Sequence, residues 1–367
     1  MKTLMYTVLI ILIVIPVLVR VITSQSKFGS IPKGERLERI KKSSNFKDGK
    51  FQNLSETPQM SEEASFLTIL KELLLSKDKR PKTQIPSVKT DLKKLAPEEN
   101  VLVWFGHSSY FIQVDGKKIL VDPVFSGSAS PFSFNVKAFK GSNVYTSAEM
   151  PEIDYLIITH DHWDHLNYKT ILELKPKISK IITGLGVGEH LERWGFCTDM
   201  IIEKDWFEDV QLNDDFKLSF TPARHFSGRG LRHKRTLWVS FVLQTPTQKI
   251  FIGGDGGYDS HFKEIGKKYG PIDLAILENG QYNKAWKYIH LMPEQVLEAA
   301  RDLDAKRLFP VHSGKFALAN HSWSDPLTQI TNLNKKNPMP LLTPIIGEIV
   351  YLDKTSQQFS SWWESTN

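Results

Sequence analysis

The fold of this chain is decided by one stretch of sequence, Thr159-His160-Asp161-His162-Trp163-Asp164-His165. It follows the apolar run Tyr155-Leu156-Ile157-Ile158, which is typical of a buried strand that ends at a polar loop. Three histidines and two aspartates beside a core strand are costly to desolvate unless an opposite charge compensates them. Imidazole and carboxylate suit zinc and its first-row neighbours, and the absence of thiolates from the stretch argues against a cysteine-based structural site. The stretch therefore predicts a divalent metal site at the end of a strand.

Within the stretch, His160 and His162 lie two residues apart in extended chain, so both side chains can face one ion. Asp164 and His165 come after the bend and can serve a second ion nearby. The alternative is a metal-free surface loop that is rich in histidine. The rest of the chain argues against this alternative.

Similar residues recur after three further predicted strands. His225 follows residues 216–224, Asp255 follows residues 250–254 and His312 follows residues 308–311. Taken singly, a histidine after a strand is usually structural, and an aspartate beside glycines is often a turn residue. Because each candidate stands at a strand end, their joint recurrence predicts ligands gathered along one rim.

The composition is that of an ordinary globular protein, with 367 residues of which 41% are hydrophobic and 24% charged. The net charge is +6 and the pI is near 9.0. Lysines and arginines are dispersed rather than clustered, so we expect no nucleic-acid partner, whereas anionic lipid or a phosphorylated substrate fits the charge. The single cysteine, Cys197, excludes an intrachain disulfide and is expected to be buried.

Residues 1–25 are predicted to form an uncleaved single-pass membrane anchor, with a signal segment as the alternative. Sixteen residues from Leu4 to Val19 are almost wholly apolar, and no convincing cleavage site follows. Positive charges crowd the C-terminal side of this run: Arg20, Lys27, Lys33, Arg36, Arg39, Lys41 and Lys42. The positive-inside rule then favours a cytoplasmic catalytic domain over a periplasmic or extracellular one.

Residues 26–99 are predicted to be a polar arm that contains one amphipathic helix. The helix is expected from Glu62 to Leu75, with Phe66, Leu67, Ile69, Leu70, Leu73 and Leu74 near one face. Two interpretations stay open: a linker with one docked helix, or a segment that faces the membrane or the substrate.

Residues 100–355 alternate between predicted strands and helices, and residues 356–367 form a C-terminal tail. Strands are expected at 101–105, 110–114, 118–121, 180–183, 216–220, 238–243, 249–252, 274–277, 307–310 and 345–352, with a hairpin at Asp115-Gly116. Helices are expected at 169–174, 188–194, 260–269, 293–303 and 326–334. This order predicts an α/β fold in which two mixed sheets are flanked by helical layers.

The pattern H-x-H-x-D-H, with a later histidine, a Gly-Asp-x-Gly aspartate and a last histidine, resembles the metallo-β-lactamase superfamily of metal hydrolases. The resemblance implies an αβ/βα sandwich with a two-metal site at the rim between the sheets. It would place His160, His162 and His225 on one ion and Asp164, His165 and His312 on the other. Asp255 would bridge the two ions. His162 stands where a di-iron, oxygen-reducing branch has glutamate, so the resemblance implies two Zn²⁺ ions and hydrolysis, with other divalent metals left open.

A closer resemblance spans residues 101–351. It is carried by Trp104-Phe105-Gly106-His107, Leu120-Val121-Asp122-Pro123-Val124-Phe125-Ser126, Ser128-Ala129-Ser130-Pro131, Thr236-Leu237-Trp238, residues 262–266, residues 270–274 and His290-Leu291-Met292-Pro293-Glu294. These segments are similar to the N-acyl-phosphatidylethanolamine-hydrolysing phospholipase D family, whose members release an N-acylethanolamine and phosphatidic acid from a membrane phospholipid. The chain departs from the family at Gly254-Asp255-Gly256-Gly257-Tyr258, Glu278-Asn279-Gly280-Gln281-Tyr282 and Arg232-His233-Lys234-Arg235. The last two departures bear on lipid specificity.

The resemblance also suggests roles for residues around the metals. A water between two divalent ions would ionise near neutral pH and act as the nucleophile, with Asp164 orienting it. His290 is the candidate for stabilising phosphoryl oxygens or protonating the leaving group. Asp122, at a strand end, is expected to hold a metal-binding imidazole. His107 is expected to bind substrate in the pocket, with a purely structural role as the alternative, and Arg224 is expected to bind a substrate phosphate, with a merely solvated side chain as the alternative.

Three functions follow as hypotheses. The first is a membrane-tethered, zinc-dependent phospholipase D of lipid metabolism whose substrate is an N-acylated membrane phospholipid. The second is a lactonase or phosphodiesterase of the same fold that acts on a small soluble metabolite. The third is an inactive anchored scaffold, which the seven filled metal positions disfavour. Neither the acyl-chain preference nor the oligomeric state can be derived, and a homodimer is left open.

Overall fold

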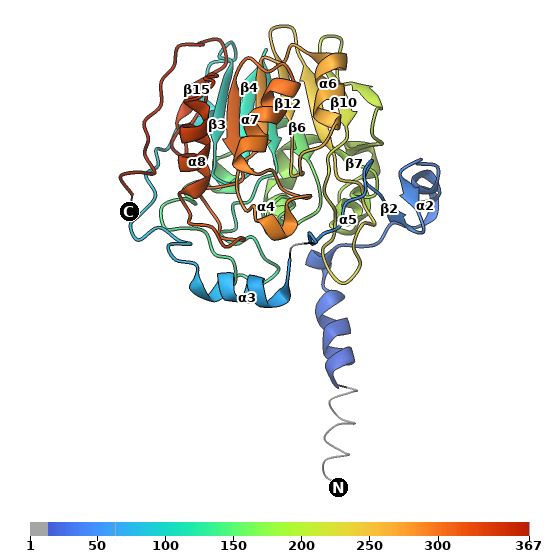
Figure 1. The fold of residues 1–367 in the computed structure, drawn as a ribbon. Helices are drawn as coiled ribbons and strands as arrows, with labels where there is room; N and C mark the ends of the chain where they lie inside the picture. Colours follow the sequence, from blue (N-terminus) through green and yellow to red (C-terminus); the bar gives the residue numbers. More distant parts are fainter. Residues whose placement is uncertain (1–13, 63, 367) are drawn as a thin grey trace.

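The computed structural model describes residues 14–62 and 64–366. Two β-sheets face each other, and helices cover their outer faces (Figure 1). The seven-stranded sheet has the order β15 (Ile349–Tyr351), β3 (Val101–Trp104), β4 (Tyr110–Val114), β5 (Lys117–Val121), β6 (Ile153–Ile158), β7 (Ile178–Gly184) and β8 (Ile201–Lys204). The six-stranded sheet has the order β14 (Leu308–Val311), β13 (Leu274–Glu278), β12 (Lys249–Ile252), β11 (Ser240–Gln244), β10 (Lys217–Thr221) and β9 (Asp209–Gln211).

Both sheets are mixed, as predicted. In the first, β15 to β5 pair antiparallel and β5 to β8 pair parallel. In the second, β9 to β12 pair antiparallel and β12 to β14 pair parallel. The hairpin predicted at Asp115-Gly116 joins β4 to β5, and both of its central residues have positive φ, 46° and 76°.

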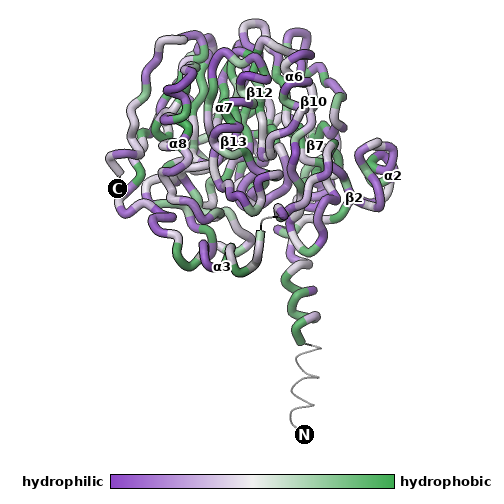
Figure 2. Tube along the Cα trace, viewed as in Figure 1, coloured by the Kyte–Doolittle hydropathy of each residue, from purple (hydrophilic) through white to green (hydrophobic). Residues whose placement is uncertain are grey.

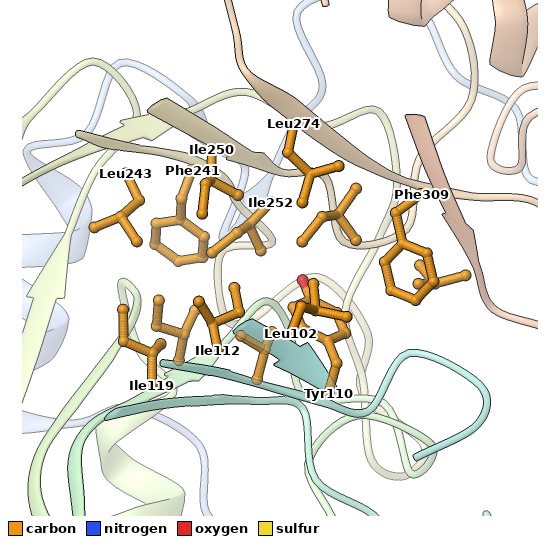
Figure 3. Packing of buried hydrophobic residues seen from close by; sticks show 14 of the residues in the cluster. Leu102, Tyr110, Ile112, Ile119, Phe241, Leu243, Ile250, Ile252, Leu274 and Phe309 are labelled. Carbon is orange, nitrogen blue, oxygen red and sulfur yellow. The ribbon is translucent and has the colours of Figure 1, made fainter. Parts of the chain in front are cut away.

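Strands in both sheets are apolar on both faces, because each sheet packs on two sides. One set of side chains meets between the sheets, among them Leu102, Ile112, Phe241, Ile250 and Phe309 (Figure 3). The alternate side chains of the first sheet pack on α4 (Tyr168–Leu174) and α5 (Gly188–Arg193). Those of the second sheet pack on α6 (His261–Tyr269), α7 (Pro293–Asp302) and α8 (Asp325–Asn334). This burial explains the near-continuous apolar runs in the sequence.

The arm adds elements that the sequence analysis missed. Besides the expected α3 (Phe66–Leu75), it contains α2 (Gly34–Lys41) and a small hairpin of β1 (Phe46–Lys47) and β2 (Lys50–Phe51). Arg36 of α2 forms ion pairs with Glu189, Glu192 and Glu203 at 3.1, 2.8 and 2.7 Å, so the arm is fastened to the domain. The start of α3 at Phe66 follows from the side chain of Ser65, which accepts a hydrogen bond from the Thr68 amide.

The predicted anchor at residues 1–25 lies partly outside the described residues. Residues 14–23 form a helix that projects from the domain, on the side where α3 lies (Figure 1), and most of its residues are hydrophobic (Figure 2). None of the helices in the described ranges combines the length and the apolar character needed to cross a bilayer. Cys197, expected to be buried, is instead exposed, since it lies in the turn after α5.

Candidate metal centre

The residues of the predicted site are brought together from the ends of four strands. The loop 159–167 follows β6, His225 follows β10, Asp255 follows β12 and His312 follows β14. The ligand atoms fall into overlapping groups in which all atoms lie within 4.8 Å of one another: His160, His162 and His225; His107, Asp164, His165 and His312; His160, His165 and Asp255; Asp255, Glu278, His290 and His312. All seven predicted metal ligands therefore gather at one place.

The first cluster consists of three imidazoles. Nδ1 of His162 lies 2.9 Å from Nε2 of His160 and 3.2 Å from Nε2 of His225. Burial lowers the pKa of all three imidazoles, and neighbouring histidines lower the pKa of His160 and His225 further. Three neutral imidazoles that converge in this way are a donor set for zinc and related divalent ions.

The second cluster combines imidazoles with carboxylates. Nε2 of His165 lies 3.5 Å from Oδ2 of Asp164, and His162 O accepts hydrogen bonds from the amides of His165 and Leu166, which form a turn after His162. Burial opposes the ionisation of Asp164, but His165 and His107 outweigh it and hold its pKa well below the ordinary value. The carboxylate is thus charged, as metal ligation requires.

Asp255 lies between the two clusters. Its Oδ2 is 3.9 Å from Nε2 of both His160 and His225 and 3.2 Å from Nε2 of His165, while its Oδ1 is 3.2 Å from Nδ1 of His312. Burial raises the pKa of Asp255, but the surrounding histidines outweigh burial and lower it well below its usual range. One carboxylate therefore faces both clusters, which is the position of a bridging ligand.

Two buried atoms indicate whether metal ions would fit between these side chains. Within the described part of the chain, Nε2 of His165 and Oδ1 of Asp255 have no hydrogen-bond partner. Burial lowers the pKa of His165, but Asp255 and Asp164 outweigh it and raise the pKa well above its ordinary value. A cation between these side chains would take the place of that proton and satisfy both atoms. The His/Asp clusters are consistent with a binuclear metal site.

The outer nitrogens of the imidazoles are held by hydrogen bonds. Nδ1 of His165 donates to Oδ2 of Asp122 at 2.8 Å, and Nδ1 of His225 donates to Ile289 O at 2.9 Å. Nδ1 of His160 lies 3.0 Å from Oγ1 of Thr159, which itself donates to Oδ2 of Asp122 at 2.6 Å. These bonds leave the Nε2 lone pairs of the three imidazoles directed at the clusters.

The loop 159–167 is fastened by two side chains that the sequence analysis did not assign. Asp161 accepts hydrogen bonds from the Gly228 amide, Oγ1 of Thr236 and Nε2 of His190 at 2.6, 2.9 and 3.0 Å. Arg229 is buried and donates to Asp161 O and Leu166 O at 2.8 and 2.6 Å. Arg229 therefore holds the loop 159–167 in place.

His290 lines a cavity of about 380 Å³ over the clusters, together with the apolar side chains of Met60, Phe226, Trp286, Ile289 and Leu318. Nδ1 of His290 lies 2.6 Å from Oε2 of Glu278, which is buried at the end of β13. Burial raises the pKa of Glu278, and Glu278 in turn raises the pKa of His290 against the effect of burial. Glu278 was missed, although its place at a strand end is the same signal that identified the other residues.

His107 and Arg224 do not contact the cavity as predicted. His107 is 0% exposed, and its Nε2 lies 2.8 Å from Oδ2 of Asp164, so it supports the carboxylate of the second cluster. Arg224 donates to Glu56 O and Tyr258 O at 2.7 and 3.0 Å, which fastens the arm to the domain. Neither side chain is among the residues that line the cavity over the clusters.

Three residues of the site adopt backbone conformations that are unfavourable for residues other than glycine. His107, Asp122 and His312 have φ values of 56°, 42° and 68°. Each directly follows or lies close to the end of a strand: β3, β5 and β14. Such strain is typical of functional sites, where the surrounding structure holds the residue in place.

Comparisons with known proteins agree with this geometry. Residues 117–313 match the family model of the beta-lactamase superfamily domain. The chain is 34% identical over 328 residues to an uncharacterised protein of Mycobacterium tuberculosis, which covers 88% of this chain and 87% of that protein. It is 28% identical over 260 residues to the N-acyl-phosphatidylethanolamine-hydrolyzing phospholipase D 1 of Caenorhabditis elegans, covering 64% of this chain and 72% of that protein. Among solved structures, the metallo hydrolase Igni18 of Ignicoccus hospitalis shares the fold, with a TM-score of 0.52, 19% identity and coverage of 68% of this chain and 97% of that one.

Proposed function

Because the chain belongs to the metallo-β-lactamase superfamily of metal-dependent hydrolases, we propose that it is a di-zinc phosphodiesterase that cleaves N-acyl-phosphatidylethanolamine to N-acylethanolamine and phosphatidic acid. The observation that carries the proposal is the position of Asp255, whose Oδ2 lies 3.9 Å from His160 and His225 of the first cluster and 3.2 Å from His165 of the second. A pair of ions a few ångströms apart suits the displacement at a phosphoryl group, since it neutralises both the attacking and the leaving oxygen.

The choice of substrate rests on the cavity and on the relatives. The wall of the cavity over the clusters combines apolar side chains with the imidazoles of His233 and His290, as an amphiphilic phosphodiester requires. The C. elegans relative is named for hydrolysis of N-acyl-phosphatidylethanolamine, and 64% of this chain is similar to it. These observations favour a phospholipid over a small soluble metabolite.

The donor sets fit zinc. Imidazole nitrogens with carboxylate oxygens, and without cysteine, match catalytic zinc sites. When bound, two such ions would lower the pKa of water towards neutrality and neutralise charge on the phosphoryl oxygens. His160, His162 and His225 would hold one ion, Asp164, His165 and His312 the other, and Asp255 both.

The remaining steps are assigned to the chain's own residues. Asp164 keeps its Oδ2 on His107, so its Oδ1 is free to accept the proton of the attacking water. His290 is oriented by Glu278, which leaves Nε2 of its ring for the leaving oxygen of the ethanolamine. Because Glu278 raises the pKa of His290, the ring carries a proton on Nε2 at neutral pH and donates it to the leaving oxygen, while the proton on Nδ1 stays hydrogen-bonded to Glu278. Apolar side chains around the cavity limit the entry of bulk water.

We also propose that the enzyme acts at a membrane. In this proposal the N-terminal segment is a single-pass membrane anchor, and the domain lies on the cytoplasmic side. This rests on the apolar run from Leu4 to Val19 and on the cations that follow it. The exposed side chains of α3 support it, since Leu67 and Leu74 are both 75% exposed. Domain boundaries near residues 25, 99 and 355 belong to the same proposal.

The test is hydrolysis of vesicles that contain N-acyl-phosphatidylethanolamine by zinc-loaded full-length protein. Mass spectrometry should detect N-acylethanolamine and phosphatidic acid in equal amounts, and His165→Ala should abolish both. A short-chain lactone and a soluble aryl phosphodiester serve as comparison substrates. If zinc-loaded protein cleaves either soluble substrate but releases no N-acylethanolamine, the lipid assignment is wrong and the alternative activity replaces it.

A further inference from the structure

A second cavity, of about 650 Å³, lies between the N-terminal helix and the loop of residues 228–236. The helix contributes Pro16, Val19, Arg20 and Thr23, which share one face at helical spacing. The metal cavity takes Phe226 and His233 from this part of the chain, but no described residue lines both cavities, so the two are distinct. The second cavity contains none of the predicted metal ligands.

The wall of this cavity carries an excess of positive charge. Five arginines line it against a single carboxylate: Arg20, Arg193, Arg229, Arg232 and Arg235 against Asp161. Both oxygens of Asp161 are engaged by hydrogen bonds from the Gly228 amide, Thr236 and His190. The carboxylate is therefore held in the loop and does not serve as a counter-ion for all five guanidiniums.

The arginines differ in how many of their N–H donors already form hydrogen bonds within the protein. Arg193 and Arg229 donate to backbone carbonyls, including Gly29 O at 2.7 Å and Lys27 O at 2.9 Å. Arg235 donates to Gly49 O at 2.6 Å, but its buried Nε has no hydrogen-bond partner among the described residues. Arg20 and Arg232 make no side-chain hydrogen bond or ion pair within the described ranges. Two guanidiniums, those of Arg20 and Arg232, thus retain their donors for a ligand.

From this we propose that the cavity binds the phosphate group of an anionic phospholipid. Guanidinium groups bind phosphate through paired N–H donors, and Arg20 and Arg232 supply them from the helix and the loop. The apolar side chains beside them, Val19 at 36% exposure and Leu231 at 76%, lie where an acyl chain would leave the headgroup. The site lies outside the metal clusters and goes beyond the proposed hydrolysis.

The lipid is favoured over free phosphate by the helix itself. Its outer side chains are exposed and apolar, among them Val17 at 56% and Leu18 at 54%. A helix that is apolar on its outer side and presents Arg20 to a cationic cavity fits the interface between lipid tails and headgroups. Figure 2 shows this apolar helix as it leaves the domain.

The test measures binding of the full-length protein to phosphatidylcholine vesicles with and without phosphatidic acid, at an ionic strength of about 0.15 M. The variant Arg20→Gln/Arg232→Gln should lose the preference for acidic vesicles by about tenfold or more, since each cation at an acidic surface contributes strongly. The matched control is Lys263→Gln/Lys267→Gln on α6, which removes the same charge from exposed positions outside the cavity. The control should keep most of the preference, and all proteins should bind neutral vesicles alike and unfold at similar temperatures.

Calorimetric titration with inorganic phosphate distinguishes the source of the ligand. Phosphate binding that the cavity variant loses, without any preference for acidic vesicles, supports a phosphate site and overturns the lipid as its occupant. Equal losses in the cavity variant and the α6 control overturn the site itself, because diffuse attraction then explains the binding. No preference for acidic vesicles and no phosphate binding by the wild-type protein overturn it as well.

Discussion

Asp122 accepts a hydrogen bond from Nδ1 of His165 at 2.8 Å, and both side chains are buried. The same oxygen accepts from Thr159, whose hydroxyl oxygen lies 3.0 Å from Nδ1 of His160. His160 belongs to one cluster and His165 to the other. One carboxylate therefore orients an imidazole in each half of the proposed metal site.

Replacing this carboxylate should weaken metal binding at both positions. Asp122→Asn exchanges an acceptor for a donor and disturbs both imidazoles, so we expect affinity for zinc to fall about 10- to 100-fold. Competition with a chromogenic chelator measures it. Asp154→Asn on β6, whose carboxylate accepts from the Lys118 amide, is the matched control. Unchanged affinity in Asp122→Asn would show that the metal ligands do not depend on it.

Removing the imidazole of His290 should slow the chemical step and leave the metals bound. We expect His290→Gln to lower kcat about 100-fold or more, because a positioned acid contributes at least that much. The comparison is His233→Gln, which changes another imidazole of the same cavity and should alter kcat only a few-fold. A wild-type kcat in His290→Gln with full metal content excludes His290 as the acid.

Arg224→Gln should loosen the arm near the cavity. The substitution removes donors to Glu56 O and Thr57, so residues 53–60, which include Met60 of the cavity wall, should be cleaved faster in limited proteolysis. We expect a higher KM and a nearly unchanged kcat. Arg301→Gln, which removes a single bond to Asn337 O, is the control. Equal proteolysis of both variants contradicts the role given to Arg224.

Lys315 should make stability depend on pH in the alkaline range. Its Nζ is buried and donates to Phe105 O and Val124 O, and burial lowers the pKa of the amine from 10.5 to about 7. Between these values the unfolded chain binds more protons, so stability rises with pH, by at most about 1.4 kcal/mol per pH unit. Below about pH 7 the amine is protonated in the folded protein as well, so the stability gained between pH 7 and 10.5 is absent.

Lys315→Met tests this dependence. The free energy of unfolding, measured by urea denaturation between pH 7 and 10, should rise less steeply in the variant than in the wild-type protein. Other groups titrate in the same range, and the difference between the two proteins isolates Lys315. Parallel curves would mean that the amine keeps its ordinary pKa in the folded state.

Much of the fold and of the metal site could be predicted from the sequence. β4 and β12 have the predicted bounds, because short, mostly apolar runs flanked by turn residues mark a buried strand clearly. The strand-end rule located the histidines and Asp255. β8 and β9 were missed, since they are short, and their burial pattern is weak.

Contacts between distant segments could not be predicted in the same way. Nothing in the local sequence of Arg224 shows that residues of the arm, 167 positions away, would occupy its guanidinium. His107 likewise resembled a cavity residue because it follows a strand, whereas its direction depends on the positive φ of its backbone and on Asp164. Periodicity identifies which residues are buried, but tertiary packing decides what they face.

The most direct test of the binuclear centre is the number of divalent ions bound per chain. After reconstitution with zinc and removal of excess metal, elemental analysis should find two ions per wild-type chain, and Asp255→Asn should retain fewer than one, because its carboxylate faces both clusters. A wild-type chain that binds no zinc, or an Asp255→Asn chain that still binds two ions, would contradict the account.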